Sequence, residues 1–424
     1  MSVKSINFAK MNIEKNRKIF WEVGLIALLL LIGWHLYCSS DEVSAGPKVV
    51  VCIPVYGQSL ALGEESERLT DFGRLKNDYA GRIVTQRMDY DFGYFANEEW
   101  RELIKRVIRY DKRSFELSVY SMSECLAQQT GEDTLICIFP GGRGATTISN
   151  LSQGTKPYRK FLNDIRTAYE KARKKGWILY VPAVCWMQGE SDMVDYPGYD
   201  YMQQLLQWRK DINRDICAIT HQTQPVRLIC YQPNAVTRAK RFHENDYESC
   251  EVSVSQAFVE LLDKDSMFWA SGPTYPYDFV REAIHIDAKG QQAIGQLAAH
   301  SALRIIRGQA PFKGLIPLSV VAGDCNVQIS FNVPSPPLRL DTLQVSKPSC
   351  YGFSVITPQG QNIAESISLN DTSIVVSCSQ PVAGCKVRYA VNGEVGKSGR
   401  INGPRGNLCD AQHHWCYQFE KIIK

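Results

Sequence analysis

The chain of 424 residues has little excess charge, because its formal net charge of +4 is small for this length. It also lacks a stripe of lysine and arginine interleaved with aromatic residues, the usual pattern of a nucleic-acid surface. Nucleic acid is therefore not expected as a partner. With 44% hydrophobic residues, the chain can bury a sizeable core and is long enough for two domains.

Histidine is scarce as well, with seven in the whole chain. Four of them are weak candidates for a catalytic role. His221 and His300 fall in helical patterns, His243 lies in a charged loop, and His35 lies in the apolar N-terminal segment. His285 differs, because it falls on a predicted loop just before a helical pattern. An imidazole on such a loop can reach a nucleophile.

Cysteine is abundant, with fourteen residues, but the positions argue against a simple disulfide framework. Four fall inside predicted buried strands, where a free thiol behaves as a small hydrophobe: Cys52, Cys137, Cys185 and Cys230. Cys378 and Cys385 flank a turn and could be bridged. A zinc ion could be bound by Cys409, His413, His414 and Cys416. The Cys-x6-Cys spacing is long for a zinc site, so a Cys409–Cys416 bridge or two free thiols is favoured over zinc binding. No metal and no cofactor are expected.

The N-terminus resembles an export signal. Five basic residues among the first 18 precede an almost wholly apolar stretch from Val23 to Tyr37. Val43-Ser44-Ala45 suits cleavage, Cys38 suggests lipid modification behind a poor lipobox, and residues 20–37 are just long enough to span a membrane. We expect residues 1–45 to be a signal peptide or a membrane anchor. The remaining chain is then periplasmic, exposed on the cell surface or secreted.

One strand-like run ends in a serine. Residues 49–56 form an apolar, β-branched run that stops abruptly at Gly57-Gln58-Ser59. Such a run predicts a buried parallel strand, and open α/β sheets bind ligands at the carboxyl ends of such strands. Ser59 is the leading candidate for a nucleophile. The alternative is that Ser59 only caps the next helix.

Two later segments deliver polar groups in the same way. Residues 177–186 read as another buried strand and end in Met187-Gln188-Gly189-Glu190-Ser191-Asp192. Near the end of the α/β pattern, residues 282–290 read Glu-Ala-Ile-His-Ile-Asp-Ala-Lys-Gly, with His285 at their centre. The strand ends therefore gather a hydroxyl, an amide, carboxylates and an imidazole.

These blocks together resemble the SGNH hydrolase superfamily, in particular its sialate O-acetylesterase and acetylxylan esterase branch. The resemblance covers roughly residues 48–308, and Gln-Gly-Glu-Ser-Asp is its most specific part. It implies a Ser59 nucleophile, a His285 general base and an orienting acid at Glu282, three residues before the histidine. The family usually has Asp at this position, so Asp278 or a water-held dyad remains an alternative source of orientation.

The resemblance also implies an oxyanion hole. Its expected donors are the Ser59 amide, the Gly144 amide and the Gln188 side chain, with Ala145 one register away as an alternative. Glu190 and Asp192 are too close on one loop to flank a sugar as a glycosidase pair. We expect these two carboxylates and the Gln58 side chain to support the site or to bind substrate.

The fold predicted from these patterns is an α/β, three-layer α/β/α sandwich with a parallel, flavodoxin-like sheet. Helical stripes such as Phe161, Ile165 and Ala168 are expected to pack on that sheet. The segment between about Gly63 and Glu132 looks like an elaborated insertion after the nucleophile. Short alternating runs after about Pro311 predict a small antiparallel β-sandwich. The expected domains are residues 46–310 and 311–424.

Three functions fit these observations. The first is an exported carbohydrate O-acetylesterase that acts on sialic acid or an acetylated polysaccharide. The second is a lipid or thioester hydrolase with the same machinery, which would need an apolar acyl groove. The third is a non-catalytic carbohydrate-binding protein, which the departure at Glu282 keeps open. A classical α/β-hydrolase fits less well, because its Gly-x-Ser-x-Gly elbow would need glycine at Ala61 and normally follows several strands.

Overall fold

The computed structural model describes residues 48–85, 101–102, 115–194, 200–235 and 253–423. The predicted signal or anchor, including apolar residues 20–37, lies outside these ranges. Within them, no helix is long and apolar enough to cross a membrane. Residues Pro47–Lys424 form one compact unit.

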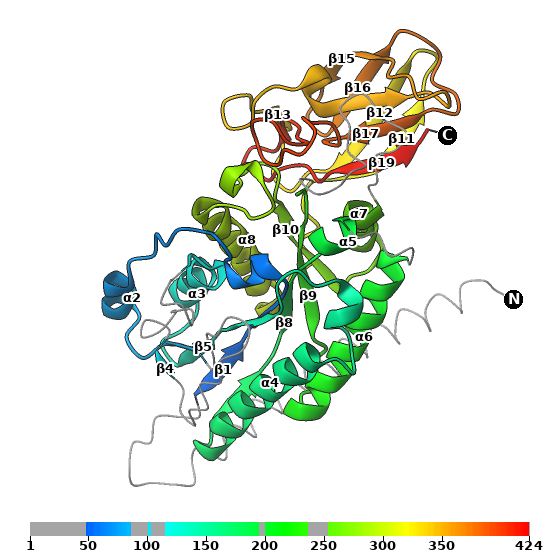
Figure 1. The fold of residues 1–424 in the computed structure, drawn as a ribbon. Coiled ribbons are helices and arrows are strands. Elements are labelled where there is room, and N and C mark those ends of the chain that lie inside the picture. The colour runs from blue at the N-terminus through cyan, green and yellow to red at the C-terminus, as the bar shows by residue number, and fades with distance from the viewer. Residues whose placement is uncertain (1–47, 86–100, 103–114, 195–199, 236–252, 424) are drawn as a thin grey trace, which may run out of the picture. The chain divides into compact units, whose positions relative to one another are not determined.

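The α/β region is built on parallel strands in two hydrogen-bonded sets (Figure 1). The first set has the order β4-β3-β5-β1-β7, and its members are β4 (Arg101–Glu102), β3 (Ile83–Thr85), β5 (Thr134–Cys137), β1 (Val49–Cys52) and β7 (Ile178–Tyr180). The second has the order β10-β9-β8-β2-β6, with β10 (Phe268–Pro273), β9 (Arg227–Gln232), β8 (Ala183–Met187), β2 (Val55–Gly57) and β6 (Pro140–Gly142). Only the β3–β4 pair is antiparallel among these strands.

The two sets are halves of one sheet, because backbone bonds carry the ladder across the break between them. The Ile53 amide donates to Cys137 O at 3.0 Å, and the Val55 amide donates to Phe139 O at 2.9 Å. On the other side of this strand, the Cys185 amide donates to Pro54 O at 2.9 Å. Pro54 cannot donate, so it interrupts the strand without ending it. Leaving the edge strands β3 and β4 aside, the joined strands have the order 2-1-3-4-5 in chain sequence, which is the predicted flavodoxin-like arrangement.

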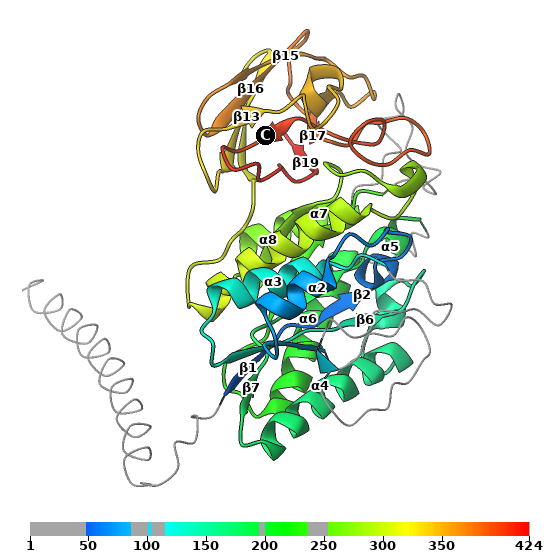
Figure 2. The same ribbon diagram turned by 90° about the vertical axis from the view of Figure 1, so that its left-hand side faces the viewer.

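Helices cover both faces of the sheet (Figures 1 and 2). The helices α2 (Phe72–Asp78), α3 (Ser118–Gln129) and α8 (Ala288–Ile306) lie on one face, and α4 (Lys156–Lys174), α6 (Tyr201–Thr220) and α7 (Ser253–Lys264) lie on the other. Phe161, Ile165 and Ala168 of α4 are fully buried, as their spacing predicted. The three-layer α/β/α sandwich is thus confirmed.

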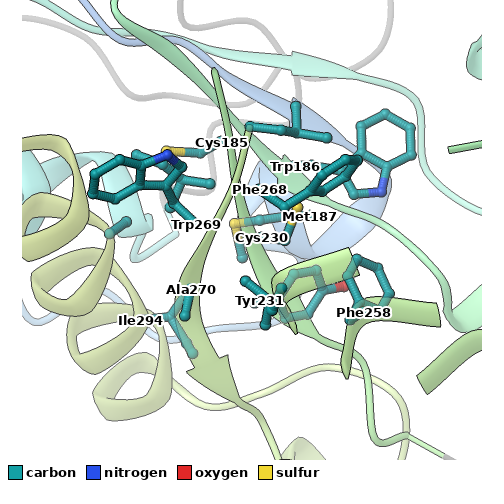
Figure 3. Packing of buried hydrophobic residues seen from close by; sticks show 14 of the residues in the cluster. Cys185, Trp186, Met187, Cys230, Tyr231, Phe258, Phe268, Trp269, Ala270 and Ile294 are labelled. Carbon is teal, nitrogen blue, oxygen red and sulfur yellow. The ribbon is translucent and has the colours of Figure 1, made fainter. Parts of the chain in front are cut away.

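Large side chains fill both interfaces between the sheet and its helices (Figure 3). Trp186 of β8 is fully buried, and its indole N–H donates to Tyr201 OH at 3.2 Å. Ala270 of β10 lies beside Ile294 of α8, whereas Tyr231 of β9 lies beside Phe258 of α7. Truncating an aromatic residue in such a core typically costs about 3–5 kcal/mol. The strand ends that carry polar groups are therefore fixed by a well-packed core.

Cysteines contribute to this core as thiols. Cys52, Cys137, Cys185 and Cys230 are buried and unpaired, which confirms their predicted role as small apolar side chains. Within the described ranges, Cys378, Cys385, Cys409 and Cys416 are also free thiols, so neither suggested bridge is formed.

The chain after residue 311 is antiparallel, as predicted. One sheet has the order β11-β12-β16-β15, with β11 (Ile316–Ala322), β12 (Asn326–Asn332), β16 (Ser373–Cys378) and β15 (Ala364–Leu369). A second contains β14 (Phe353–Ile356), β17 (Lys386–Tyr389) and β19 (Phe419–Ile422), and β13 (Arg339–Leu340) pairs with β18 (Leu408–Cys409). Val327, Ile329 and Phe331 of β12 are buried while the residues between them are more exposed. This alternation is the sequence signal of a half-buried strand.

Buried polar side chains join this C-terminal region to the ends of β9 and β10. Gln232 donates to Gln418 O at 2.8 Å and accepts from the Gln418 amide at 2.8 Å. Tyr417 OH accepts from the Gly272 amide at 2.8 Å. Buried polar groups need such partners, so these bonds fix the C-terminal strands onto the carboxyl edge of the parallel sheet. The predicted division at residue 310 thus falls between two tightly joined regions.

Candidate active site

Ser59 lies where β2 meets its neighbours at the carboxyl edge of the sheet. It is the first residue of the 3-10 helix η1 (Ser59–Leu62), and only 6% of its surface is exposed. Two glycines make this approach possible. A Cβ on Gly57 would lie 1.9 Å from Met187 O, and a Cβ on Gly142 would lie 1.8 Å from Gly57 O. Glycine is required here because the backbones of β6, β2 and β8 leave no room for a side chain.

His285 comes from the loop between β10 and α8. The loop folds back on itself, because the Val280 amide donates to His285 O at 2.8 Å and the Asp287 amide donates to Asp278 O at 2.8 Å. Asp287 then caps α8 by accepting from the Gly290 amide at 2.8 Å. The result is that His285 Nε2 lies 2.8 Å from Ser59 Oγ. The structure thus brings together the predicted nucleophile and the predicted base.

The carboxylate on the other side of the imidazole belongs to Glu65. Its Oε2 lies 2.8 Å from His285 Nδ1. Since a carboxylate only accepts, Nδ1 carries the ring proton and Nε2 is left to accept from the Ser59 hydroxyl. The hydrogen bond to His285 lowers the pKa of Glu65, and the neighbouring Arg281 adds to this effect against the opposing effect of burial. Glu65 is therefore ionised at neutral pH.

Glu65 occupies a turn just past the nucleophile. The Glu64 amide donates to Ser59 O at 3.1 Å and the Ser66 amide donates to Gly63 O at 3.2 Å, so the chain folds back directly after η1. Glu65 itself has a left-handed φ of 62°. A non-glycine residue in this region costs about 1–3 kcal/mol and persists only where its surroundings hold it. The bonds to His285 and Arg281 do so here.

Glu282, the acid expected from the sequence, is not the partner of His285 in this structure. Its carboxylate accepts from Lys397 Nζ at 2.7 Å and from Asn402 Nδ2 at 2.6 Å. The hydrogen bond to Lys397 is the main cause of a lowered Glu282 pKa. The alternative acid, Asp278, accepts from Arg400 Nε at 2.7 Å. Both carboxylates thus pair with the C-terminal region, and the expected contact between Glu282 and the imidazole is corrected to Glu65.

Two of the expected oxyanion donors, the Ser59 and Gly144 amides, have no hydrogen-bond acceptor among the described residues. Ser59 begins a helix, so its N–H has no acceptor within that helix. Gly144 lies in the loop between β6 and the 3-10 helix η3 (Ile148–Leu151), and no described residue accepts a hydrogen bond from its N–H. The neighbouring Ala145, the alternative donor, has a left-handed φ of 49°.

Gln188 is placed differently from the expected oxyanion donor. Its side chain is fully buried, and its amide donates to Thr146 O at 3.2 Å and to the Asp192 carboxylate. Its Oε1 accepts from Tyr201 OH at 2.9 Å. These bonds use both ends of the amide, because a primary amide has two N–H groups and one carbonyl oxygen. Gln188 therefore braces the site from within in this structure.

The other support residues link the loops that surround Ser59. Gln58 Oε1 accepts from the Ser191 amide at 3.2 Å, joining the loop after β2 to the short helix α5 (Glu190–Val194). Asp192 Oδ2 accepts from the Ile148 amide at 3.0 Å, joining the same helix to η3. The side chains of Gln58 and Asp192 are almost fully buried, so in this structure they fix the loops around the nucleophile.

Glu190 is a fully buried acid beside this network. Its Oε1 accepts from Tyr231 OH at 2.5 Å, while no described residue pairs with its Oε2. Burial raises the pKa of Glu190 to about 7, with a smaller contribution from Asp192 and an opposing one from the Tyr231 hydrogen bond. The charged form of such a group is disfavoured because it has lost its water.

No group of three or more His, Cys, Asp or Glu side chains is arranged to hold a metal within the described ranges. In the suggested zinc cluster, His414 Nδ1 instead pairs with Asp410 Oδ2 at 2.8 Å.

Comparison with known proteins gives one family match. The model of the carbohydrate esterase family described as sialic acid-specific acetylesterase matches residues 94–304. This range contains His285, Gly144 and the Gln188–Asp192 block, whereas Ser59 and Glu65 precede it. No curated protein matches the chain in sequence.

Solved structures support the fold. A carbohydrate acetylesterase from Xanthomonas citri has a TM-score of 0.62 and 12% identity, with 88% of this chain and 80% of that chain covered. A protein from Arabidopsis thaliana is 17% identical with a TM-score of 0.43, covering 61% of this chain and 98% of that chain. NanS is 13% identical with a TM-score of 0.44, covering 63% and 100%. At 12% identity, the similarity to the Xanthomonas citri structure shows the fold alone.

The raised pKa of Glu190 predicts a pH-dependent stability. The folded-state pKa is about 7 and the ordinary value is 4.5, so the unfolded chain releases this proton first as pH rises. Stability should therefore fall between about pH 4.5 and pH 7 through this group. Glu190→Gln keeps an acceptor for Tyr231 and should flatten that fall, which urea unfolding midpoints across this range would measure. An equal slope in both proteins would contradict the assignment.

Proposed function

We propose, from the premise that residues 94–304 belong to the sialic acid-specific acetylesterase family of carbohydrate esterases, that this protein is a serine esterase removing O-acetyl groups from carbohydrates. The observation that carries the proposal is the hydrogen-bonded row Ser59–His285–Glu65, with 2.8 Å at each step. A hydroxyl, an imidazole and a carboxylate in this order are the parts of an activated serine nucleophile.

The row gives each residue a role. Ser59 Oγ attacks the acetyl carbonyl while His285 Nε2 takes the hydroxyl proton, and the ionised Glu65 stabilises the imidazolium that forms. Collapse of the tetrahedral intermediate breaks the ester bond, and His285 returns the proton to the departing sugar hydroxyl. Water then attacks the acetyl–Ser59 ester with His285 again as base, which releases acetate. The oxyanion of both intermediates is bound by the Ser59 and Gly144 amides.

The two competing functions differ from the proposed one in what they require of the site. A non-catalytic carbohydrate-binding protein was suggested by the unusual Glu282, but Glu65 provides the missing carboxylate contact. A lipid or thioester hydrolase would need a long apolar acyl groove beside Ser59. A comparison of acetyl, butyryl and octanoyl esters separates these functions.

Export belongs to the same proposal. It is supported by the basic and then apolar pattern of residues 1–45, with residues 20–37 either removed with a signal peptide or kept as a membrane anchor. A carbohydrate esterase outside the cytoplasm would meet acetylated glycans directly.

The proposed nucleophile predicts that Ser59→Ala abolishes hydrolysis of acetylated sugars. Loss of the attacking oxygen should lower kcat by about 10⁴-fold or more, because the remaining residues cannot form the acyl-enzyme. Release of acetate by the wild type and the variant would be measured, with circular dichroism as the check on folding. Near-normal turnover by a folded Ser59→Ala protein would reject the mechanism.

The corrected acid gives a second prediction. Glu65→Gln should lower kcat by about 10²- to 10⁴-fold, because an amide neither balances the imidazolium nor enforces the Nδ1–H tautomer. Glu282→Gln, a matched isosteric change on the loop of His285, should have a smaller effect, because its amide oxygen can still accept a hydrogen bond from Lys397 or Asn402. Steady-state kinetics of both variants decide the matter. A greater loss in Glu282→Gln would restore the acid expected from the sequence.

Arg143 offers a test of the substrate. Its amide donates to Gly57 O at 3.0 Å, which places it beside the strand of Ser59, and its side chain is exposed without an ion-pair partner among the described residues. A guanidinium there suits a carboxylate such as that of a sialic acid. Arg143→Gln should raise KM about tenfold for O-acetylated sialic acid and leave KM for a neutral acetylated xylo-oligosaccharide unchanged. Equal changes for both substrates would contradict carboxylate recognition.

A further inference from the structure

One loop of the C-terminal region meets the loop that carries His285. We define the clamp loop as residues 394–402. We propose that the clamp loop holds the His285 loop in its reactive conformation, and that Lys397 and Asn402 are positioning residues for the reaction. This inference rests on the proposed esterase function, since it concerns the placement of its general base.

The first support is the density of polar contacts between the two loops. Glu282 receives hydrogen bonds from Lys397 at 2.7 Å and from Asn402 at 2.6 Å. Its carbonyl oxygen also accepts from the Ser398 amide at 2.9 Å. Three groups of the clamp loop thus converge on one residue of the His285 loop.

A second point of attachment lies at the base of the His285 loop. The Arg400 amide donates to Tyr277 O at 3.2 Å, and Arg400 Nε donates to Asp278 Oδ1 at 2.7 Å. Gly399 lies between these contacts with a φ of +90°, and a Cβ there would lie 3.0 Å from both Tyr277 O and Phe279 Cδ2. A side chain at this position would thus be packed unusually tightly against the His285 loop, and the positive φ also favours glycine.

The clamp loop is itself well anchored. The Glu394 amide donates to Asn402 O at 2.7 Å, which closes the loop at its two ends. Ser346 fixes it from outside, because its amide donates to Arg400 O at 3.0 Å and its hydroxyl donates to Ile401 O at 2.5 Å. A loop held in this way can impose a conformation on its neighbour.

The conformation that it imposes is one that the His285 loop would not adopt alone. Arg281 and Glu282 both have left-handed backbones, with φ values of 57° and 51°. Such residues persist where their surroundings over-determine them. Arg281 is held by Glu65, and Glu282 is held by the clamp loop. The Val280 amide then bonds to His285 O, so this strained tip is coupled to the imidazole within one short loop.

The chain offers a matched control for Lys397. Lys386 has a side-chain exposure of 46% against 42% for Lys397, and it too pairs with one carboxylate, Glu420, at 3.5 Å. Lys386 and Glu420 both belong to the C-terminal sheets and lie on β17 and β19. Removing this ion pair perturbs the same region of the protein without touching the His285 loop.

The test measures kcat and KM on one acetylated sugar for three proteins. They are the wild type, the double variant Lys397→Met/Asn402→Ala and the control Lys386→Met. The double variant should lose about 10- to 100-fold in kcat with little change in KM, because a small displacement of His285 weakens proton transfer from Ser59. Lys386→Met should keep the wild-type kcat. The conservative single variant Lys397→Arg should retain most of the wild-type kcat. Thermal unfolding of each protein shows whether it is folded.

A second measurement does not depend on turnover. The His285 Nδ1 proton shared with Glu65 should give a low-field proton resonance in the wild type, and this signal should broaden or vanish in the double variant. If the wild type showed the resonance but no esterase activity, the esterase function would be rejected. The clamp loop could still position His285 in that case. If the folded double variant kept the wild-type kcat and an unchanged resonance, the positioning role of the clamp loop would be overturned.

Discussion

The site depends on a close passage of three backbones. At Gly57, strand β2 runs between β6 and β8 so closely that a Cβ would collide with Met187 O, and Gly142 meets the same constraint against Gly57 O. Main-chain bonds across this point, from Gln58 to Met187 and from Arg143 to Gly57, hold the strand ends together. Side chains that follow these strands are delivered to one place because the sheet itself cannot spread there.

Much of this arrangement could be predicted from the sequence. β-branched runs that stop at polar residues identify buried parallel strands, and the carboxyl ends of such strands share one edge. This signal predicts Ser59 and the Gln188–Asp192 block, whereas His285 is predicted from its place on a loop just before a helical pattern. The antiparallel C-terminal strands followed from period-two patterns with frequent turn residues, because alternation and turn chemistry are local signals.

The orienting acid could not be found by the same reasoning. Glu65 stands in the polar run Glu64-Glu65-Ser66-Glu67, whose three glutamates the sequence alone does not distinguish. Only the turn after η1, with a left-handed backbone at Glu65, selects one of them for the imidazole. The resemblance to the SGNH hydrolases implies Glu282, three residues before His285, but the partners of Glu282 in this structure lie more than a hundred residues later in the chain. The one available signal was proximity, since a carboxylate a single turn beyond a nucleophile cannot be far from it. The role of Gln188 differs from the predicted one for a related reason, because its buried acceptors, Thr146 O and the Asp192 carboxylate, belong to a separate loop and to the helix α5 that follows it.

The bonds between Gln232, Asn234 and Gln418 have a consequence for how the protein can be divided. All three side chains are fully buried, and the first two belong to the α/β region while the third belongs to the C-terminal region. A fragment ending near residue 310 would keep every strand of the parallel sheet, yet it would turn these paired amides towards water or leave them without partners. The two regions look separable by composition, but they cannot be exchanged independently. A chimera with a foreign C-terminal region would also need the matching amides on the other side of the junction.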